Sequence, residues 1–398
     1  MAAGVTNPTA GAAARPGQPA VRRRLPVLVL GVLCLLAGLW GGLLLLGLPL
    51  PTLRSQTAAD HGPLMALGFL GTVISLERAV SLHRRWAFAA PLTAGAGGVA
   101  LLVGLPAVLG WALLCLASVV FVLIYAVLLK IQPLLHLKAM AAGAVCWYVA
   151  TVLWLGGMAI PRLVPWLAGF LVFTILGERL ELARVALLSR TSVRAFTAGA
   201  VVFGAGLVVC VLPGRAGPVG IRIAGIGMLM LAIWAAGYDV ARRTVKVAGV
   251  TRFMAVCLLA GYVWLLITGL LWLVIGDVGR SVAVYDASLH AVFLGFVMSM
   301  IFGHAPVIVP SVLRVPLPFH RLFYVHLAVL HVALVVRLLL GDAVGSTLGW
   351  QVGGVGTEVA VVLFLLASAS AVVRAQLARR ATPRPAAGAA GRPSGERP

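Results

Sequence analysis

The chain has 398 residues, of which 62% are hydrophobic and only 10% are charged, and its formal net charge is +21. A soluble domain carries roughly 25% charged residues, so an ordinary water-facing globule is excluded and the bilayer must solvate most of the chain. The basic residues sit in short loops and tails, where they orient helices and contact anionic headgroups, and we expect no nucleic-acid partner.

Apolar runs predict an all-α polytopic membrane protein with twelve transmembrane helices in a domain at 25–378, between disordered tails at 1–24 and 379–398. The predicted spans cover residues 25–49, 62–82, 87–105, 107–129, 138–158, 163–188, 195–212, 220–238, 251–275, 283–309, 319–340 and 348–375. The third and fourth spans have the weakest boundary, because only Leu105 and Pro106 separate them.

Basic residues concentrate in every second loop, which is the pattern of cytoplasmic loops. These loops hold Arg84 and Arg85, Lys130 and Lys138, Arg190 and Arg194, Arg242, Arg243, Lys246 and Arg252, and Arg314 and Arg321. The alternation predicts that both termini lie in the cytoplasm, and it supports the helix count. We expect the membrane to be a bacterial-type inner (cytoplasmic) membrane. The oligomeric state is not predicted.

Three helices share a short pattern, which suggests an internal repeat. The segments Gly68–Glu77, Gly169–Glu178 and Gly295–His304 each begin Gly-Phe, have Ile six residues after the glycine and end on a polar residue. Apolar helices also match by coincidence. We favour three pseudo-repeated four-helix units, with the second, sixth and tenth helices in equivalent places.

Three four-helix arcs around a pseudo-threefold axis are the plan of haem-copper oxidase subunit I, which the chain resembles in architecture. It resembles the NnrS family more specifically, through Asp60–Gly62 leading into Gly68–Phe69 and through Ser288–His290 leading to Gly303–His304. The resemblance implies a protein that binds haem and copper and is linked to nitric oxide or nitrosative stress. It makes nitric oxide a candidate small-molecule ligand.

Two histidines within the spans are the main candidates for cofactor binding. His61 lies seven residues before its repeat glycine and His290 lies five before its own, a difference of about 3 Å along a helix. Neutral imidazoles at matching depth could supply both axial bonds of a b-type haem iron. Asp60 and Asp286 are candidate acceptors for the second ring N–H, although both could simply be polar residues near the headgroups.

A second polar layer lies at the other end of the repeated segments. Glu77, Glu178 and His304 occupy the matching position. Further charged residues lie close by in sequence, namely Arg78, Arg179, Glu181 and Arg184. This layer could be a second metal site or a proton route, but interhelical ion pairs are the favoured interpretation.

The remaining histidines set limits on the chemistry. His304, His326 and His331 are weaker metal candidates, for copper above all, and each could instead be a packing residue. His83, His136 and His320 are interpreted as solvated histidines at helix ends. The alternatives to haem binding are a secondary transporter that uses Glu77, Glu178 and His304, and a scaffold without cofactor.

We expect no terminal oxidase, because spans six and seven contain no histidine for a copper centre. Whether the protein is an enzyme of another kind is left open, and the sequence assigns no catalytic residue.

Overall fold

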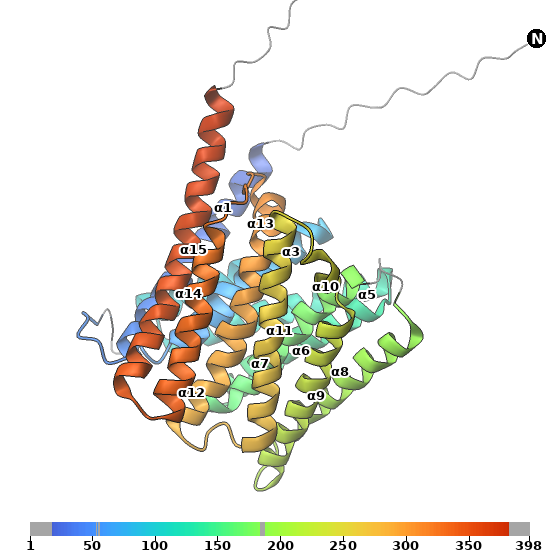
Figure 1. Cartoon of the computed structure of the whole chain (residues 1–398), viewed down its shortest axis with the longest axis vertical. Helices are drawn as coiled ribbons and strands as arrows, with labels where there is room; N and C mark the ends of the chain where they lie inside the picture. The colour runs from blue at the N-terminus through green and yellow to red at the C-terminus, as the bar shows by residue number, and fades with distance from the viewer. Residues whose placement is uncertain (1–17, 53, 55, 184–187, 382–398) are drawn as a thin grey trace, which may run out of the picture. The chain divides into compact units, whose positions relative to one another are not determined.

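The computed structural model describes residues 18–52, 54, 56–183 and 188–381 (Figure 1). The structure is 83% helical, and its described part contains no strand. Within those residues, twelve helices are long and apolar enough to cross a membrane, so the predicted all-α polytopic fold is confirmed.

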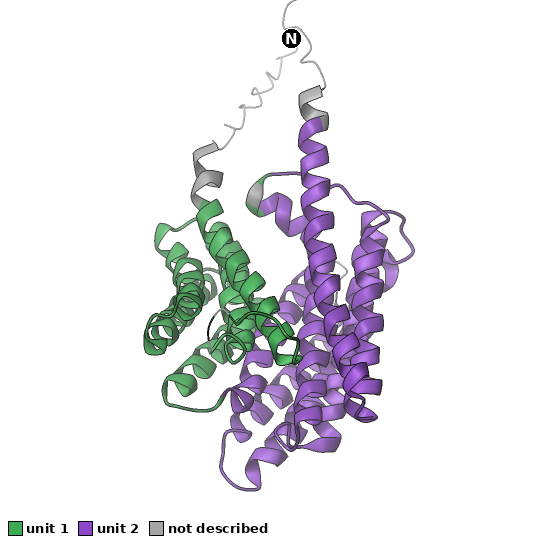
Figure 2. Ribbon diagram, turned by 90° about the vertical axis from the view of Figure 1, so that its left-hand side faces the viewer, with its two compact units in different colours: residues 1–159, 312–314 green, residues 160–311, 315–398 purple. Residues whose placement is uncertain are grey.

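The chain divides into two compact units, which Figure 2 colours separately. Unit 1 comprises residues 1–159 and 312–314, and unit 2 comprises residues 160–311 and 315–398. The repeat of three four-helix units stays a prediction.

The helices of unit 1 are α1 (Gln18–Leu45), α2 (His61–Pro63), the π-helical η1 (Leu64–Gly71), α3 (Thr72–Leu82), the 3₁₀-helical η2 (Arg85–Phe88), α4 (Ala89–Val103), α5 (Ala107–Ile131) and α6 (Leu135–Leu155). The predicted third and fourth spans are two separate helices, because α4 ends at Val103 and α5 begins at Ala107. Gly104 takes a left-handed conformation at φ +89° and Pro106 is extended, so neither residue continues a helix.

Unit 2 begins with α7 (Ile160–Ala183), α8 (Arg190–Val209), α9 (Ala216–Tyr238), α10 (Ala241–Thr244) and α11 (Val250–Ile275). It continues with α12 (Val282–His290), the π-helical η4 (Ala291–Met298), α13 (Ser299–Leu313), α14 (Phe323–Val336), the π-helical η5 (Arg337–Ala343) and α15 (Thr347–Ala381). The end of α13, at 312–313, is grouped with unit 1. Since α1 begins at Gln18 and α15 ends at Ala381, both helices extend into the predicted tails, which otherwise lie outside the described residues.

Small residues bring the last two spans of unit 2 into close contact, and α14 and α15 run side by side in Figure 1. A Cβ on Gly353 would lie 2.5 Å from the backbone nitrogen of Arg337, and one on Gly356 would lie 2.6 Å from the Cβ of Ala333. Only glycine permits this approach, which is typical of helix pairs in membranes. The contact fixes the position of Arg337 at the start of η5, where its side chain bonds Asp286.

Candidate functional site

His290 is the last residue of α12, and its ring is held by its own helix. Its Nδ1 lies 2.9 Å from the carbonyl oxygen of Asp286 and 3.2 Å from Oδ1 of the same residue. Both atoms are acceptors, so Nδ1 carries a proton, and in the neutral tautomer the lone pair lies on Nε2. A metal-binding histidine is usually oriented in this way, and Asp286 is the acceptor that the sequence suggested.

His61 opens α2 in unit 1 and takes the same tautomer through a different partner. Its Nδ1 lies 2.6 Å from the carbonyl oxygen of Gly38 on α1, whereas the sequence suggested the Asp60 carboxylate as the acceptor. Asp60 is half-buried, and burial raises the pKa of its carboxyl against the opposing charge of Arg54. The tight approach of α1 explains the change of partner, because a Cβ on Gly41 would lie 3.3 Å from the Cβ of His61.

Both histidines are followed by a π-helical segment in the same register. The segment η1 runs from four residues before Gly68 to three after it, and η4 occupies the same positions around Gly295. Immediately afterwards, Thr72 donates to the Gly68 carbonyl at 2.6 Å and Ser299 donates to the Gly295 carbonyl at 2.6 Å. Short π-helical segments are rare and are often found at functional sites. Their matching register supports the equivalence of the second and tenth helices, although the sixth helix, α7, has no such segment.

An arginine is clamped beside His290. Arg337 donates from Nε and Nη2 to the two carboxylate oxygens of Asp286, both at 2.7 Å, and its guanidinium lies 5.5 Å from the centre of the Trp350 ring. The bidentate geometry holds Asp286 in its ionised form. Asp286 thus orients His290 and is itself fixed by a charge from η5.

The predicted second polar layer contains a buried ion pair, but not between the expected partners. In unit 2, Arg179 donates to Asp239 from Nε at 2.7 Å and from Nη2 at 2.9 Å, although Glu178 is its neighbour in sequence. Tyr262 donates to Asp239 Oδ2 at 2.8 Å, and the Ala241 N–H donates to Oδ1 at 2.7 Å. The favoured interpretation, interhelical ion pairing, is confirmed for Arg179, and its partner is a residue that the sequence did not suggest.

His304 belongs to this network. Its Nδ1 lies 2.6 Å from the carbonyl oxygen of Met300, so its Nε2 faces Arg179 Nη1 at 3.4 Å as the acceptor. The ring therefore uses both nitrogens within the protein, which weakens its candidacy as a metal ligand.

The other charged residues of that layer are divided between the two units. Arg78 and Glu77 make a 3.4 Å contact in unit 1, with their side chains 12% and 29% exposed. Glu178 is half-buried and Glu181 is exposed. Arg184 lies outside the described residues.

His326 and His331 on α14 have packing partners rather than a shared site. His326 is 1% exposed among four phenylalanine rings, those of Phe253, Phe302, Phe323 and Phe364. Nδ1 of His331 accepts a 2.9 Å hydrogen bond from Trp264 Nε1, so the lone pair on that nitrogen is engaged. These contacts favour the packing interpretation that the sequence left open for both histidines.

Of the three histidines predicted to be solvated at helix ends, two are exposed and one is buried. His83 and His320 are exposed, as expected, but His136 is only 3% exposed. The interpretation of His136 as a solvated residue was therefore wrong. It follows Leu135 at the start of α6 and is buried there.

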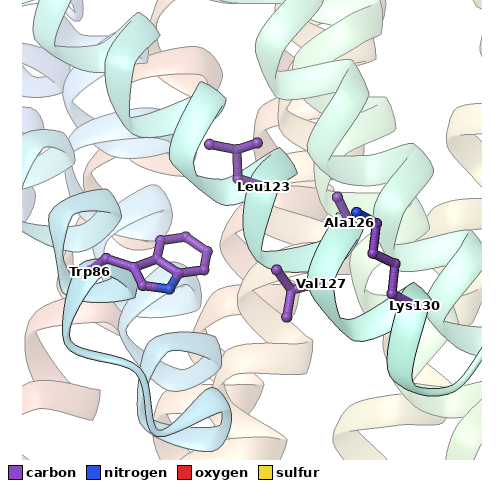
Figure 3. A pocket seen from close by; sticks show the side chains of 5 residues that line it. All are labelled: Trp86, Leu123, Ala126, Val127 and Lys130. Atoms are coloured by element: carbon purple, nitrogen blue, oxygen red, sulfur yellow. The ribbon is translucent and has the colours of Figure 1, made fainter.

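No three His, Cys, Asp or Glu side chains converge as a metal ion would require anywhere in the described ranges. Unit 1 has a surface hollow of about 370 Å³ lined by Trp86, Leu123, Ala126, Val127 and Lys130, which Figure 3 shows. It contains none of the candidate ligands, and its apolar lining suits a lipid chain better than a polar substrate.

The twelve apolar spans and their buried ion pairs define the class: this is a multi-pass α-helical membrane protein. Residues 24–373 match a family model described as "Domain of unknown function (DUF8744)", so the chain belongs to that family. No curated protein matches the chain.

The sequence did not lead us to single out four polar residues, namely Asp239, Arg337, Asp342 and Glu358. Glu358 had a usable signal, because it is an acid in the middle of an apolar span. Asp239 and Asp342 lie at the ends of spans, where headgroup-facing acids are common, and Arg337 was indistinguishable from a loop arginine.

Proposed function

We propose that this chain binds b-type haem within the membrane, with His61 and His290 as the candidate iron ligands, each argued from the contacts within its own unit. The observation that carries the proposal is that the two imidazole rings are oriented in the same way. Each donates from Nδ1 to an acceptor in its own unit, and each precedes a π-helical segment in the same register. A neutral imidazole with its lone pair on Nε2 is the donor that haem iron takes from protein.

The chain's own residues would set the properties of this iron. Asp286 accepts from the His290 ring and so increases the basicity of the ligand, while Arg337 keeps Asp286 ionised. Bound haem would supply redox chemistry and a place for a small gas such as nitric oxide, which is the role that the NnrS resemblance implies. We limit the cofactor to haem, because the His331 and His304 rings are engaged in hydrogen bonds that copper would have to replace.

The visible spectrum of purified protein tests the proposal. After expression with ample haem precursor, the wild type should show a Soret band and a low-spin spectrum. His61→Ala and His290→Ala should each convert iron to high spin or lose haem, while His83→Ala, which removes an exposed histidine, should leave the spectrum unchanged. A colourless wild type, or alanine variants with the wild-type spectrum, would contradict the assignment.

A secondary transporter is the second candidate. Its original residues do not favour it, because His304 is committed to the Arg179 network. Two other carboxyls with buried oxygens, those of Asp342 and Glu358, give it support.

We also propose that the protein lies in the cytoplasmic membrane with both termini in the cytoplasm, on the strength of the positive loops. A reporter fused in the 84–86 loop should then report the cytoplasm, and one near residue 216 should report the outside. A cytoplasmic signal at residue 216 would overturn the orientation.

A further inference from the structure

Two further acids lie beside the Arg337–Asp286 pair. Asp342 lies at the end of η5, which packs against α12, the helix of Asp286, and Glu358 lies on α15, which packs against η5 and its Arg337. Three carboxyls therefore share one guanidinium. Arg337 carries one positive charge and can neutralise only one of them, and its Nε–Nη2 edge already bonds both oxygens of Asp286.

The second observation concerns individual oxygens. Oδ2 of Asp342 and Oε2 of Glu358 are buried and have no hydrogen-bond partner. An ionised carboxylate oxygen that is buried without a donor is costly in a membrane interior. A carboxyl that carries a proton avoids this cost, because the neutral group is much cheaper to bury and has a hydrogen to donate.

Asp286 is the ionised member of the group, because it accepts from Arg337 with both oxygens and also faces Nδ1 of His290. The buried oxygens of Asp342 and Glu358 have no such donors, so these two carboxyls are the ones that carry protons.

From this arrangement we infer that Asp342 and Glu358 are a proton-binding pair that takes up and releases protons within the membrane. A proton fits better than a metal cation, since Arg337 already holds a positive charge at the centre of the group. Asp342 lies one residue before the end of its span at Ala343, so water at the membrane surface can exchange its proton. Glu358 lies deeper, about 16 Å along the helix axis from Thr347.

The charged and titratable neighbours of the pair are few. The elements packed around η5 and α15 contribute Tyr285, Asp286, His290, Tyr324, His326, His331 and Arg337. Of these, Asp286 and Arg337 bond each other, and His326 and His331 contact aromatic rings. This inference does not depend on haem, because it concerns the carboxyls alone.

Infrared difference spectroscopy of the full-length protein in lipid nanodiscs tests the inference. A protonated carboxyl has a C=O band distinct from carboxylate bands, and the band shifts when H₂O is replaced by D₂O. The wild type should show such bands, and they should disappear as the pH is raised. Asp342→Asn and Glu358→Gln should each remove one band, whereas Asp277→Asn, at an exposed loop acid, should remove none.

Three outcomes would overturn the proton-binding pair. The wild type could show no protonated carboxyl, the bands could survive in both variants, or sodium ions could abolish them at constant pH, which would make this a cation site. If a variant fails to fold, the wild-type pH titration and deuterium shift still decide the matter. A colourless protein with these bands would leave this inference standing and remove the haem proposal.

Discussion

Unit 2 contains two arginines clamped by aspartates, and they differ in what surrounds them. Arg179 and Asp239 lie in a balanced network in which the second donor to Asp239 Oδ2 is a tyrosine hydroxyl. Arg337 and Asp286 have the same bidentate geometry, but two more carboxyls crowd around them. A balanced pair has nothing left to bind, whereas a surplus of acid must be met by protons from outside. The Arg179 cluster is therefore suited to stabilising the fold, and the Arg337 cluster is suited to exchanging protons.

The largest effect should follow from removing the carboxylate of the balanced pair. Asp239→Asn leaves Arg179 with no other acid shown to bond it and weakens the acceptor for Tyr262. Breaking a buried pair in this way costs about 3–5 kcal/mol. We expect a low yield and a marked fall in the midpoint of thermal unfolding in detergent.

The exposed Asp277→Asn variant is the matched control and should unfold like the wild type. Wild-type stability in Asp239→Asn protein would show that the Arg179 network is not the structural cluster described here.

An intermediate effect should follow from the same change in the acid-rich cluster. In Asp286→Asn protein, Asp342 or Glu358 can give up its proton and supply a carboxylate to Arg337. We therefore expect a loss of only about 1–3 kcal/mol, the usual cost of disturbing a buried hydrogen bond. Haem, if bound, should be retained with an altered potential or affinity.

Combining Asp286→Asn with Glu358→Gln sharpens the comparison, because it removes the substitute acid. The double variant should lose clearly more stability than the sum of the single variants. Strict additivity in thermal unfolding would mean that Glu358 does not replace Asp286, and the contrast between the clusters would be weaker.

The smallest effect should come from the ion pair of unit 1. Arg78 Nη2 lies 3.4 Å from Glu77 Oε1, and both side chains are partly exposed. Such pairs contribute about 0–1 kcal/mol. Glu77→Gln should fold normally and keep any haem spectrum, as judged by yield, unfolding midpoint and absorbance. Loss of the haem spectrum in well-folded Glu77→Gln protein would assign this residue a chemical role.

Much of the fold could be predicted from the sequence. Hydropathy located all twelve spans, even where only three residues, 104–106, separate the third from the fourth, because the cost of burying a residue in lipid is nearly a property of that residue. Part of the candidate site was also predictable. The link between Asp286 and His290 follows from their spacing of one helical turn, which places the two side chains on one face.

The sequence by itself thus determined the class of protein, the number of spans and the histidines that lie within them. Tertiary structure alone decided which acid meets which arginine. Arg179 donates to Asp239, which is 60 residues away in the sequence, and not to its neighbour Glu178. Arg337 likewise donates to Asp286, which is 51 residues away. Gly38 likewise takes the place expected of Asp60 at His61. The physical reason is that a charged side chain in a membrane bonds to the partner that neighbouring helices bring within about 3 Å, and helix rotation and close packing set that partner.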